Sequence, residues 1–170
     1  MKKFLLSAFI FTGIAAYSDT CNAGFYKIEG NKVYYAYDMN PNPDLVELGK
    51  QSEVKGADAK TFNNKADYGK DIKNIYFEGK IVKGVDTKTF EVLSNEKEVK
   101  NSGHRAVCYY YAKDKKNVYY KGQIINGADV KTFKVLENLY AEDKNSWYEY
   151  GKKINKDYQS GSLLNINKIF

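Results

Sequence analysis

A histidine and a cysteine four residues apart are the first side chains in this sequence whose types could support catalysis. His104 and Cys108 could together form a thiol nucleophile and its base. Such pairs usually come from distant segments of a fold, and no third polar residue that would orient the histidine is evident. We therefore interpret Cys108 as a small buried hydrophobic residue or an intermolecular partner, and we expect no enzymatic activity.

Aspartates are the second group of candidate chemical residues. Asp58, Asp86 and Asp129 recur in a short motif of the form Ala/Val-Asp-x-Lys-Thr-Phe, after Ala57, Val85 and Ala128. Calcium needs about six to eight oxygen ligands, usually clustered in one loop, and each of these aspartates has no neighbouring carboxylate. We predict that each caps the turn that follows it, and that a second set of acids consists of local turn formers. That second set is Glu29, Asp71, Asp114 and Asp143. No metal or other cofactor is expected.

Tyrosines supply the third candidate site. The chain of 170 residues holds 16 tyrosines and 9 phenylalanines but one tryptophan. Four pairs of tyrosines eight residues apart have an acid three residues after the first tyrosine. Exposed aromatic side chains in register can stack on sugar rings or contact a protein partner. The candidate binding residues are the second members of these pairs, Tyr34, Tyr76, Tyr119 and Tyr148. In the alternative interpretation, these tyrosines join neighbouring repeats in a continuous core and only their hydroxyl groups meet water.

The tyrosine pairs mark an internal repeat. Residues 71–93 and 114–136 align at a constant offset of 43, with 13 of 23 positions identical. Four units begin at Tyr26, Tyr68, Tyr111 and Tyr140, and the last unit lacks the second half of the motif. Two of the units are lengthened by insertions, at about residues 36–53 and 94–106.

Each unit has the composition of short β-strands joined by turns. Aromatic and β-branched residues favour strands, whereas Asp, Asn and Gly favour turns. Because side chains alternate across a strand, Val118 and Tyr120 should share one face and Tyr119 the other. In the same way, Ile75 and Phe77 should share one face and Tyr76 the other. We predict an all-β tandem repeat of short antiparallel strands and hairpins, with three strands per unit and tight turns at the Gly-Ala-Asp-x-Lys-Thr-Phe motif.

The repeat resembles the DKNYY family of exported bacterial proteins. The resemblance lies in Tyr111-Ala112-Lys113-Asp114, Val118-Tyr119-Tyr120 and the motif from Gly127 to Phe133, and it covers most of residues 26–164. Unit one departs from the pattern by its insertion, and unit four by its missing second half. The family has no assigned activity, so the resemblance implies an architecture and an exported location, and no catalytic residues.

The N-terminal residues predict export independently. Lys2 and Lys3 precede an apolar run over residues 4–17, and the small residues Cys21 and Ala23 stand at −3 and −1 of a cleavage site. We expect a signal peptide over residues 1–23 and a single repeat domain over residues 24–170, with no transmembrane segment in the mature chain. A lipoprotein anchor at Cys21 is the alternative, but the residues before it lack the usual small apolar pattern.

The positive charge does not predict a nucleic-acid partner. The formal net charge is +6, but Arg105 is the only arginine among 27 basic residues, and the lysines are scattered beside acids. We therefore expect a non-catalytic binding or interaction module of the periplasm or cell surface, whose partner is a protein or glycan of the cell envelope. The alternatives are an enzyme acting on envelope glycans, with its site in the inserted loops, and a periplasmic structural or assembly factor.

Overall fold

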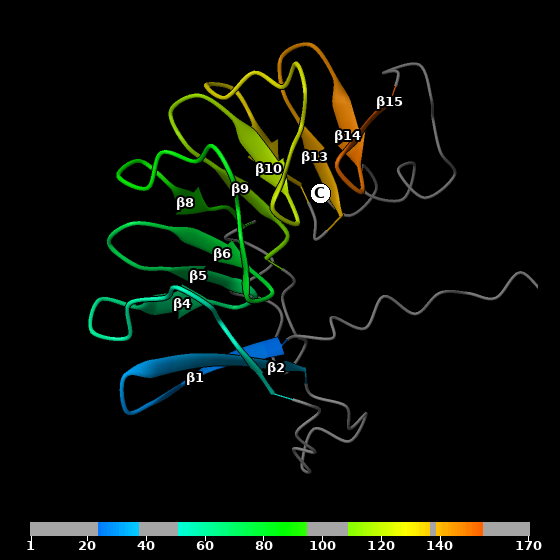
Figure 1. The fold of residues 1–170 in the computed structure, drawn as a ribbon. Helices are drawn as coiled ribbons and strands as arrows, with labels where there is room; N and C mark the ends of the chain where they lie inside the picture. The colour runs from blue at the N-terminus through cyan, green and yellow to red at the C-terminus, as the bar shows by residue number, and fades with distance from the viewer. Residues whose placement is uncertain (1–23, 38–50, 95–108, 137–138, 155–170) are drawn as a thin grey trace, which may run out of the picture.

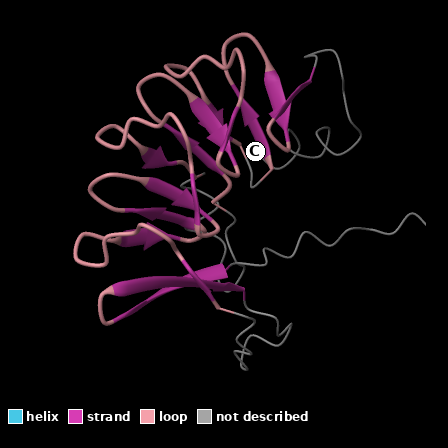
Figure 2. Cartoon of the chain, in the orientation of Figure 1, coloured by secondary structure: helices cyan, strands magenta, loops and turns pink. Residues whose placement is uncertain are grey.

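The chain folds into short antiparallel strands. The structure is a computed structural model that describes residues 24–37, 51–94, 109–136 and 139–154, and in these ranges it has strands and turns but no helix (Figure 2). The strands are β1 (Gly24–Glu29), β2 (Lys32–Tyr37), β3 (Ser52–Glu53), β4 (Asn63–Lys65), β5 (Tyr68–Lys70), β6 (Ile75–Phe77), β7 (Lys80–Ile81), β8 (Glu91–Val92), β9 (Tyr111–Lys113), β10 (Val118–Tyr120), β11 (Gln123–Ile124), β12 (Lys134–Val135), β13 (Tyr140–Glu142), β14 (Trp147–Glu149) and β15 (Lys152–Ile154). The predicted all-β fold class is confirmed.

The strands form four sheets, one for each repeat unit. The first sheet has the order β1-β2-β3, and the others have the orders β4-β5-β6-β7, β8-β9-β10-β11 and β12-β13-β14-β15. All pairings are antiparallel between neighbours in the chain. Three strands were predicted per unit, but each of the last three sheets has four.

The fourth strand comes from the junction between units. The residues that follow Phe62, Phe90 and Phe133 do not belong to the sheet of their own unit but form β4, β8 and β12, the first strands of the next sheet. Sequence reasoning assigned no strand to these residues, because two or three residues are too few to show an alternating pattern. Each unit therefore contributes a strand to its successor.

The sheets stack face to face along an arc, with the chain progressing from β1 and β2 at one end to β14 and β15 at the other (Figure 1). Each of the three spaces between sheets is filled by a hydrophobic cluster drawn from both neighbours. Between the second and third sheets, Tyr68, Ile75 and Phe77 of one sheet pack with Ala112 and Tyr119 of the next. The middle sheets are therefore buried on both faces, and the predicted alternation of side chains along β6 and β10 is confirmed.

Two-residue turns join the last two strands of each four-stranded sheet. The turn residues are Glu78-Gly79, Lys121-Gly122 and Tyr150-Gly151, and all six have positive φ angles. Two successive positive φ values define a type I′ turn, whose twist matches that of an antiparallel hairpin. In the part of the chain described here, no helix is long and apolar enough to cross a membrane.

Candidate functional site

Three of the four tyrosines proposed as binding residues lie inside the protein. Tyr76, Tyr119 and Tyr148 are 0%, 0% and 1% exposed, and Tyr34 in the first sheet is half-buried. Their rings fill the spaces between sheets; Tyr76, for example, packs against Phe62 at 5.8 Å between ring centroids. For these three residues the exposed aromatic ladder is therefore corrected, and the alternative interpretation, in which the tyrosines join neighbouring units in a continuous core, is supported. A tyrosine on either face of a middle sheet meets the neighbouring sheet before it meets solvent.

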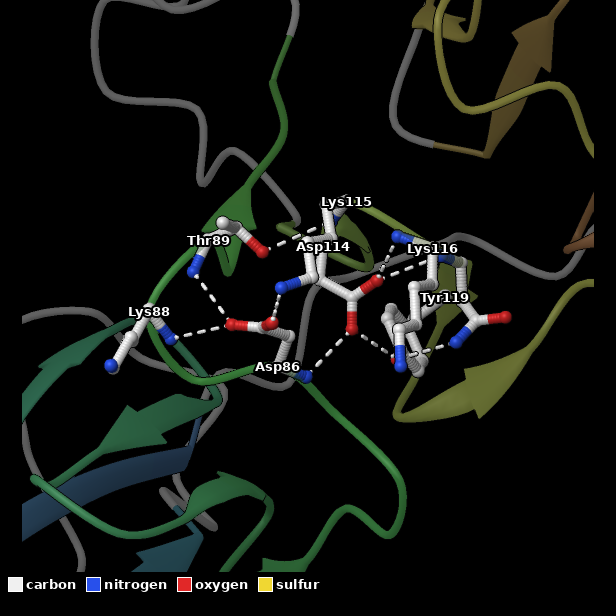
Figure 3. Close-up of polar contacts among 8 residues, drawn as sticks. Asp86, Lys88, Thr89, Asp114, Lys115, Lys116 and Tyr119 are labelled. Carbon is white, nitrogen blue, oxygen red and sulfur yellow. Dashed lines mark hydrogen bonds and ion pairs between the residues drawn. The ribbon is translucent and has the colours of Figure 1, made fainter.

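The hydroxyl groups of these buried tyrosines bind the turn acids. The oxygens of Tyr76, Tyr119 and Tyr148 donate to Oδ2 of Asp71, Asp114 and Asp143 at distances of 2.9, 2.8 and 2.7 Å. The other carboxylate oxygen, Oδ1, accepts two successive backbone N–H groups in the turn; for Asp114 these belong to Lys116 and Asn117 (Figure 3). The predicted turn-forming role of these three aspartates is confirmed.

The same carboxylates also join consecutive units, which sequence reasoning missed. Oδ2 of Asp114 accepts the backbone N–H of Asp86 from the preceding unit at 2.8 Å (Figure 3). Equivalent bonds run from Asp58 N to Asp71 and from Asp129 N to Asp143. Burial works to raise the pKa of the Asp114 carboxyl group, but the backbone and tyrosine hydrogen bonds together lower it below its usual range.

The motif aspartates cap turns, as predicted. Asp86 accepts the N–H groups of Lys88 and Thr89 (Figure 3), and Asp129 accepts the N–H and the hydroxyl group of Thr132. Two of these aspartates also form an ion pair with the next unit, Asp86 with Lys115 and Asp129 with Lys144. In unit two, the residue equivalent to Lys115 and Lys144 is Ile72, which is 68% exposed. Among the described residues, no group of three or more potential ligands could hold a metal ion.

The first tyrosine of each pair forms a second connection between units. The Tyr68 hydroxyl donates to the carbonyl of Tyr110 at 3.0 Å and accepts the N–H of Gly122 at 3.0 Å. Tyr26 and Tyr111 make the same two bonds to the sheets that follow them. The sequence feature that could have indicated this connection is the tyrosine that recurs at the start of every unit, together with the recurring glycine of the type I′ turn.

A groove between the second and third sheets is a feature of the described surface that is suited to a ligand. Its volume is about 640 Å³, and its walls are residues 77–83 of one unit and residues 121–126 of the next. Phe77, Val82 and Gly122 meet at the junction, where the Cα of Gly122 lies so close that an added Cβ would be 2.9 Å from Phe77 Cβ. We call this feature the inter-unit groove.

Three lysines give the inter-unit groove its charge. Lys80, Lys83 and Lys121 are exposed lining residues, with Glu78 as the acid among the walls. Glu78 already accepts a hydrogen bond of 2.8 Å from the Tyr37 hydroxyl, while Lys121 Nζ lies 4.2 Å above the ring of Tyr110. Tyr110 is therefore placed to stabilise the Lys121 ammonium group through a cation–π contact. The groove has an excess of positive charge.

Two isoleucines and two sheet edges complete the walls. Ile81 and Ile124 are 50% and 45% exposed and add apolar surface to the walls. They lie on β7 and β11, the last strands of their sheets. Ile81 pairs with Tyr76, and the flanking residue Val82 donates its N–H to the Ile75 carbonyl. Alternation along an antiparallel pair therefore turns the N–H and C=O of Ile81 away from β6.

The remaining candidates fall outside the described residues. His104 and Cys108 lie in the range 95–108, as does most of the second insertion, and most of the first insertion lies in the range 38–50. The inserted loops, which would hold the active site if the protein were an enzyme, therefore lie largely outside the described residues.

Comparisons with known proteins identify the repeat. The model of the DKNYY family matches residues 68–127 and, a second time, residues 95–152. The two matches together span units two to four, where the tyrosine–aspartate and tyrosine–glycine connections recur. No curated protein and no solved structure matches the chain significantly.

Proposed function

The chain belongs to the DKNYY family, and from that premise we propose that it is an exported, non-catalytic binding module of the cell envelope. The repeat supports this proposal because its most regular residues are used to join sheets: the tyrosines and turn acids that could have served a ligand are bonded to one another. The recurring residues therefore hold the fold together, and we expect a partner to be bound by surface residues that differ between units.

The inter-unit groove is the observation that carries the proposal. We infer that it binds an extended acidic segment of a protein partner. Its three lysines complement carboxylates, Ile81 and Ile124 offer apolar contact, and the outward peptide group of Ile81 can form main-chain hydrogen bonds with an added strand. Sugar rings are usually held by exposed aromatic faces, and among the lining residues the one aromatic side chain is the buried Phe77.

A charge-matched pair of variants tests the groove. In the first, Lys80, Lys83 and Lys121 are replaced by Gln; in the second, Lys60, Lys88 and Lys131 are replaced, which are exposed lysines of the three motif turns. Binding of a fluorescent glutamate-rich peptide is measured by anisotropy. We expect the first variant to bind about tenfold or more weakly and the second to bind like the wild type, since rim charges act locally in salt.

The outcomes of this experiment separate the alternatives. Equal weakening in both variants would mean general attraction by net charge and would overturn the groove as the site. If the wild-type chain binds purified envelope glycan and the groove variant does not, the inference that the partner is a protein is wrong. A stable stoichiometric complex in which the groove variant persists would favour a structural or assembly factor.

Export is tested separately by cell fractionation. We expect the mature protein in the envelope or outside the cell, shortened by the signal peptide over residues 1–23. A wholly cytoplasmic protein that retains Met1 would overturn the exported location without bearing on the groove.

A further inference from the structure

The first described residue of the chain donates its backbone nitrogen to a buried carboxylate. Gly24 N lies 2.9 Å from Oδ1 of Asp67, and the same oxygen accepts the Tyr35 hydroxyl at 2.7 Å. Gly24 is buried, and Asp67 is 4% exposed. The bond joins the start of β1 to the turn before β5, and so connects the first unit to the second.

Asp67 is an exception within the repeat. The residue immediately before the first tyrosine of a unit is Phe25, Asp67, Tyr110 or Leu139, and in units three and four the tyrosine of the preceding unit bonds the backbone carbonyl of this residue. A carboxylate is therefore not required for that connection. None of the ion pairs formed within the described ranges includes Asp67, and burial raises the pKa of its carboxyl group.

We propose that Asp67 is the receptor for a new N-terminus, the α-ammonium group created at Gly24 when the signal peptide is removed. This inference rests on the export proposed above, with cleavage after Ala23. Hydrolysis of the Ala23–Gly24 peptide bond by a signal peptidase consumes one water, whose hydroxyl joins the Ala23 carbonyl carbon and whose proton goes to the Gly24 nitrogen. At neutral pH that amine takes up a further proton and becomes a cation.

The position of Gly24 suits this role in both charge and shape. An ammonium at the Gly24 nitrogen would lie within hydrogen-bond distance of Asp67 without any movement of the backbone. A Cβ at residue 24 would be 2.0 Å from the Tyr35 hydroxyl oxygen, so only glycine fits against that ring. A buried carboxylate without a cation is costly, whereas a buried carboxylate hydrogen-bonded to a cation is a stable arrangement.

The groups around Asp67 define the pH dependence of the proposed pair. Asp67 is faced by the hydroxyl groups of Tyr26, Tyr35 and Tyr37 from the first sheet and of Tyr68 from the second. The charged groups near it are Glu78 of the β6–β7 turn and Lys121 of the β10–β11 turn. Pairing with Asp67 should raise the pKa of the α-ammonium above the ordinary value of about 7.7–8.0. The added stability is then fully present below that ordinary value and is lost as the pH rises through the raised one.

Two chains test the proposal without altering any side chain. One begins at Gly24, released from a fusion by a protease that leaves no extra residue, and the other keeps Ala23 and so has an amide at Gly24. Residues 24–154 contain all of the described structure, so both chains keep it. We expect the Gly24 chain to melt about 4 °C or more above the Ala23 chain at pH 7, and the difference to vanish at high pH.

Replacement of Asp67 by Asn in both chains supplies the control. The two melting temperatures should then coincide, because the amide no longer distinguishes an ammonium from a peptide nitrogen by charge. Equal melting temperatures of the unaltered chains at pH 7, or a difference that persists in the Asn variants, would overturn the proposal. Titration of a ¹⁵N-labelled Gly24 amine remains decisive if the Asn variants do not fold: an unshifted pKa would overturn the proposal.

The proposal and the export it rests on fail in different ways. The mass of the protein recovered from the envelope reports where cleavage occurs, and a terminus other than Gly24 would refute the cleavage site. The paired chains report whether Asp67 stabilises an amine at Gly24, whatever the cell does.

Discussion

The hydroxyl of Tyr119 donates a hydrogen bond of 2.8 Å to Oδ2 of Asp114, which lies five residues earlier in the chain. The same oxygen accepts the N–H of Asp86 from the preceding unit (Figure 3). One carboxylate thus closes its own turn, binds the buried tyrosine of its own sheet and connects two sheets. The arrangement recurs at Asp71 and Asp143.

Removal of this carboxylate should be among the most destabilising changes in the described structure. Asp114→Ala should lower the free energy of unfolding by about 3 kcal/mol, because charge-assisted hydrogen bonds are lost and the Tyr119 hydroxyl is left buried without its acceptor. Glu29→Ala is the matched control, since Glu29 occupies the same position of unit one but is exposed, and we expect a change within about 0.5 kcal/mol. Urea denaturation of both variants provides the measurement; similar losses would contradict the assigned role.

The three turn aspartates also predict acid sensitivity. Hydrogen bonds hold the pKa values of Asp71, Asp114 and Asp143 below the ordinary value in the folded state, against the opposing effect of burial. Their contribution to stability is therefore fully present above about pH 4, the unfolded value, and is lost as the pH falls through the lower folded values. Asp114→Asn should make the loss of stability below pH 4 shallower. The melting temperature is measured as a function of pH. If its fall below pH 4 is the same in the variant as in the wild type, groups other than Asp114 cause the acid sensitivity.

Gly122 and Gly127 form a matched pair with which to separate backbone conformation from close packing. Both have positive φ angles, 73° and 78°, but a Cβ at Gly122 would meet Phe77 at 2.9 Å, whereas one at Gly127 would meet nothing within 4 Å. Gly127→Ala should cost about 1 kcal/mol from backbone strain alone, and Gly122→Ala about 2–4 kcal/mol because overpacking is added. Chemical denaturation would refute the contact if the two costs were equal.

The Tyr68 hydroxyl should contribute more to stability than that of Tyr140. The Tyr68 hydroxyl bonds both Tyr110 O and Gly122 N, so Tyr68→Phe leaves the Gly122 N–H without this acceptor and removes one of the two donors to Tyr110 O, the other being Lys121 N. The change should cost about 2 kcal/mol. Tyr140 begins the last unit, and its hydroxyl bonds the half-buried Glu149 of the same sheet. Tyr140→Phe should cost less than about 1 kcal/mol. Thermal unfolding of both variants tests this order, and the reverse order would show that the connection between units is unimportant.

Ile72 offers a change expected to stabilise the protein. Lysines occupy the equivalent positions in units three and four and pair with Asp86 and Asp129, whereas Ile72 is exposed next to the turn that Asp58 caps. Ile72→Lys should raise the free energy of unfolding by at most about 1 kcal/mol, and the gain should fall with added salt because the pair would be exposed. A gain that is insensitive to salt would point to the removal of the exposed isoleucine as its cause.

The sequence predicted the strands and turns better than it predicted which residues face solvent. The fold class, the alternation along β6 and β10 and the capping aspartates followed from residue type and spacing, which act over a few positions. The burial of Tyr76 and Tyr119 was one of two interpretations that the sequence left open, because burial there depends on how closely one sheet packs on the next. The inter-unit groove did not follow from the sequence, since Lys80 and Lys121 stand 41 positions apart in the sequence and meet only through that packing.

The boundaries of the sequence repeat differ from those of the folded sheets, because each unit supplies the first strand of the next sheet. A gene segment that copies the sequence repeat, from one starting tyrosine to the next, carries β5 to β8 or the corresponding later strands and not the four strands of one sheet. An excised repeat would lack the first strand of its own sheet and carry an unpaired strand for a missing neighbour. The polypeptide itself thereby connects each sheet to the previous one, since each unit supplies the first strand of the next sheet.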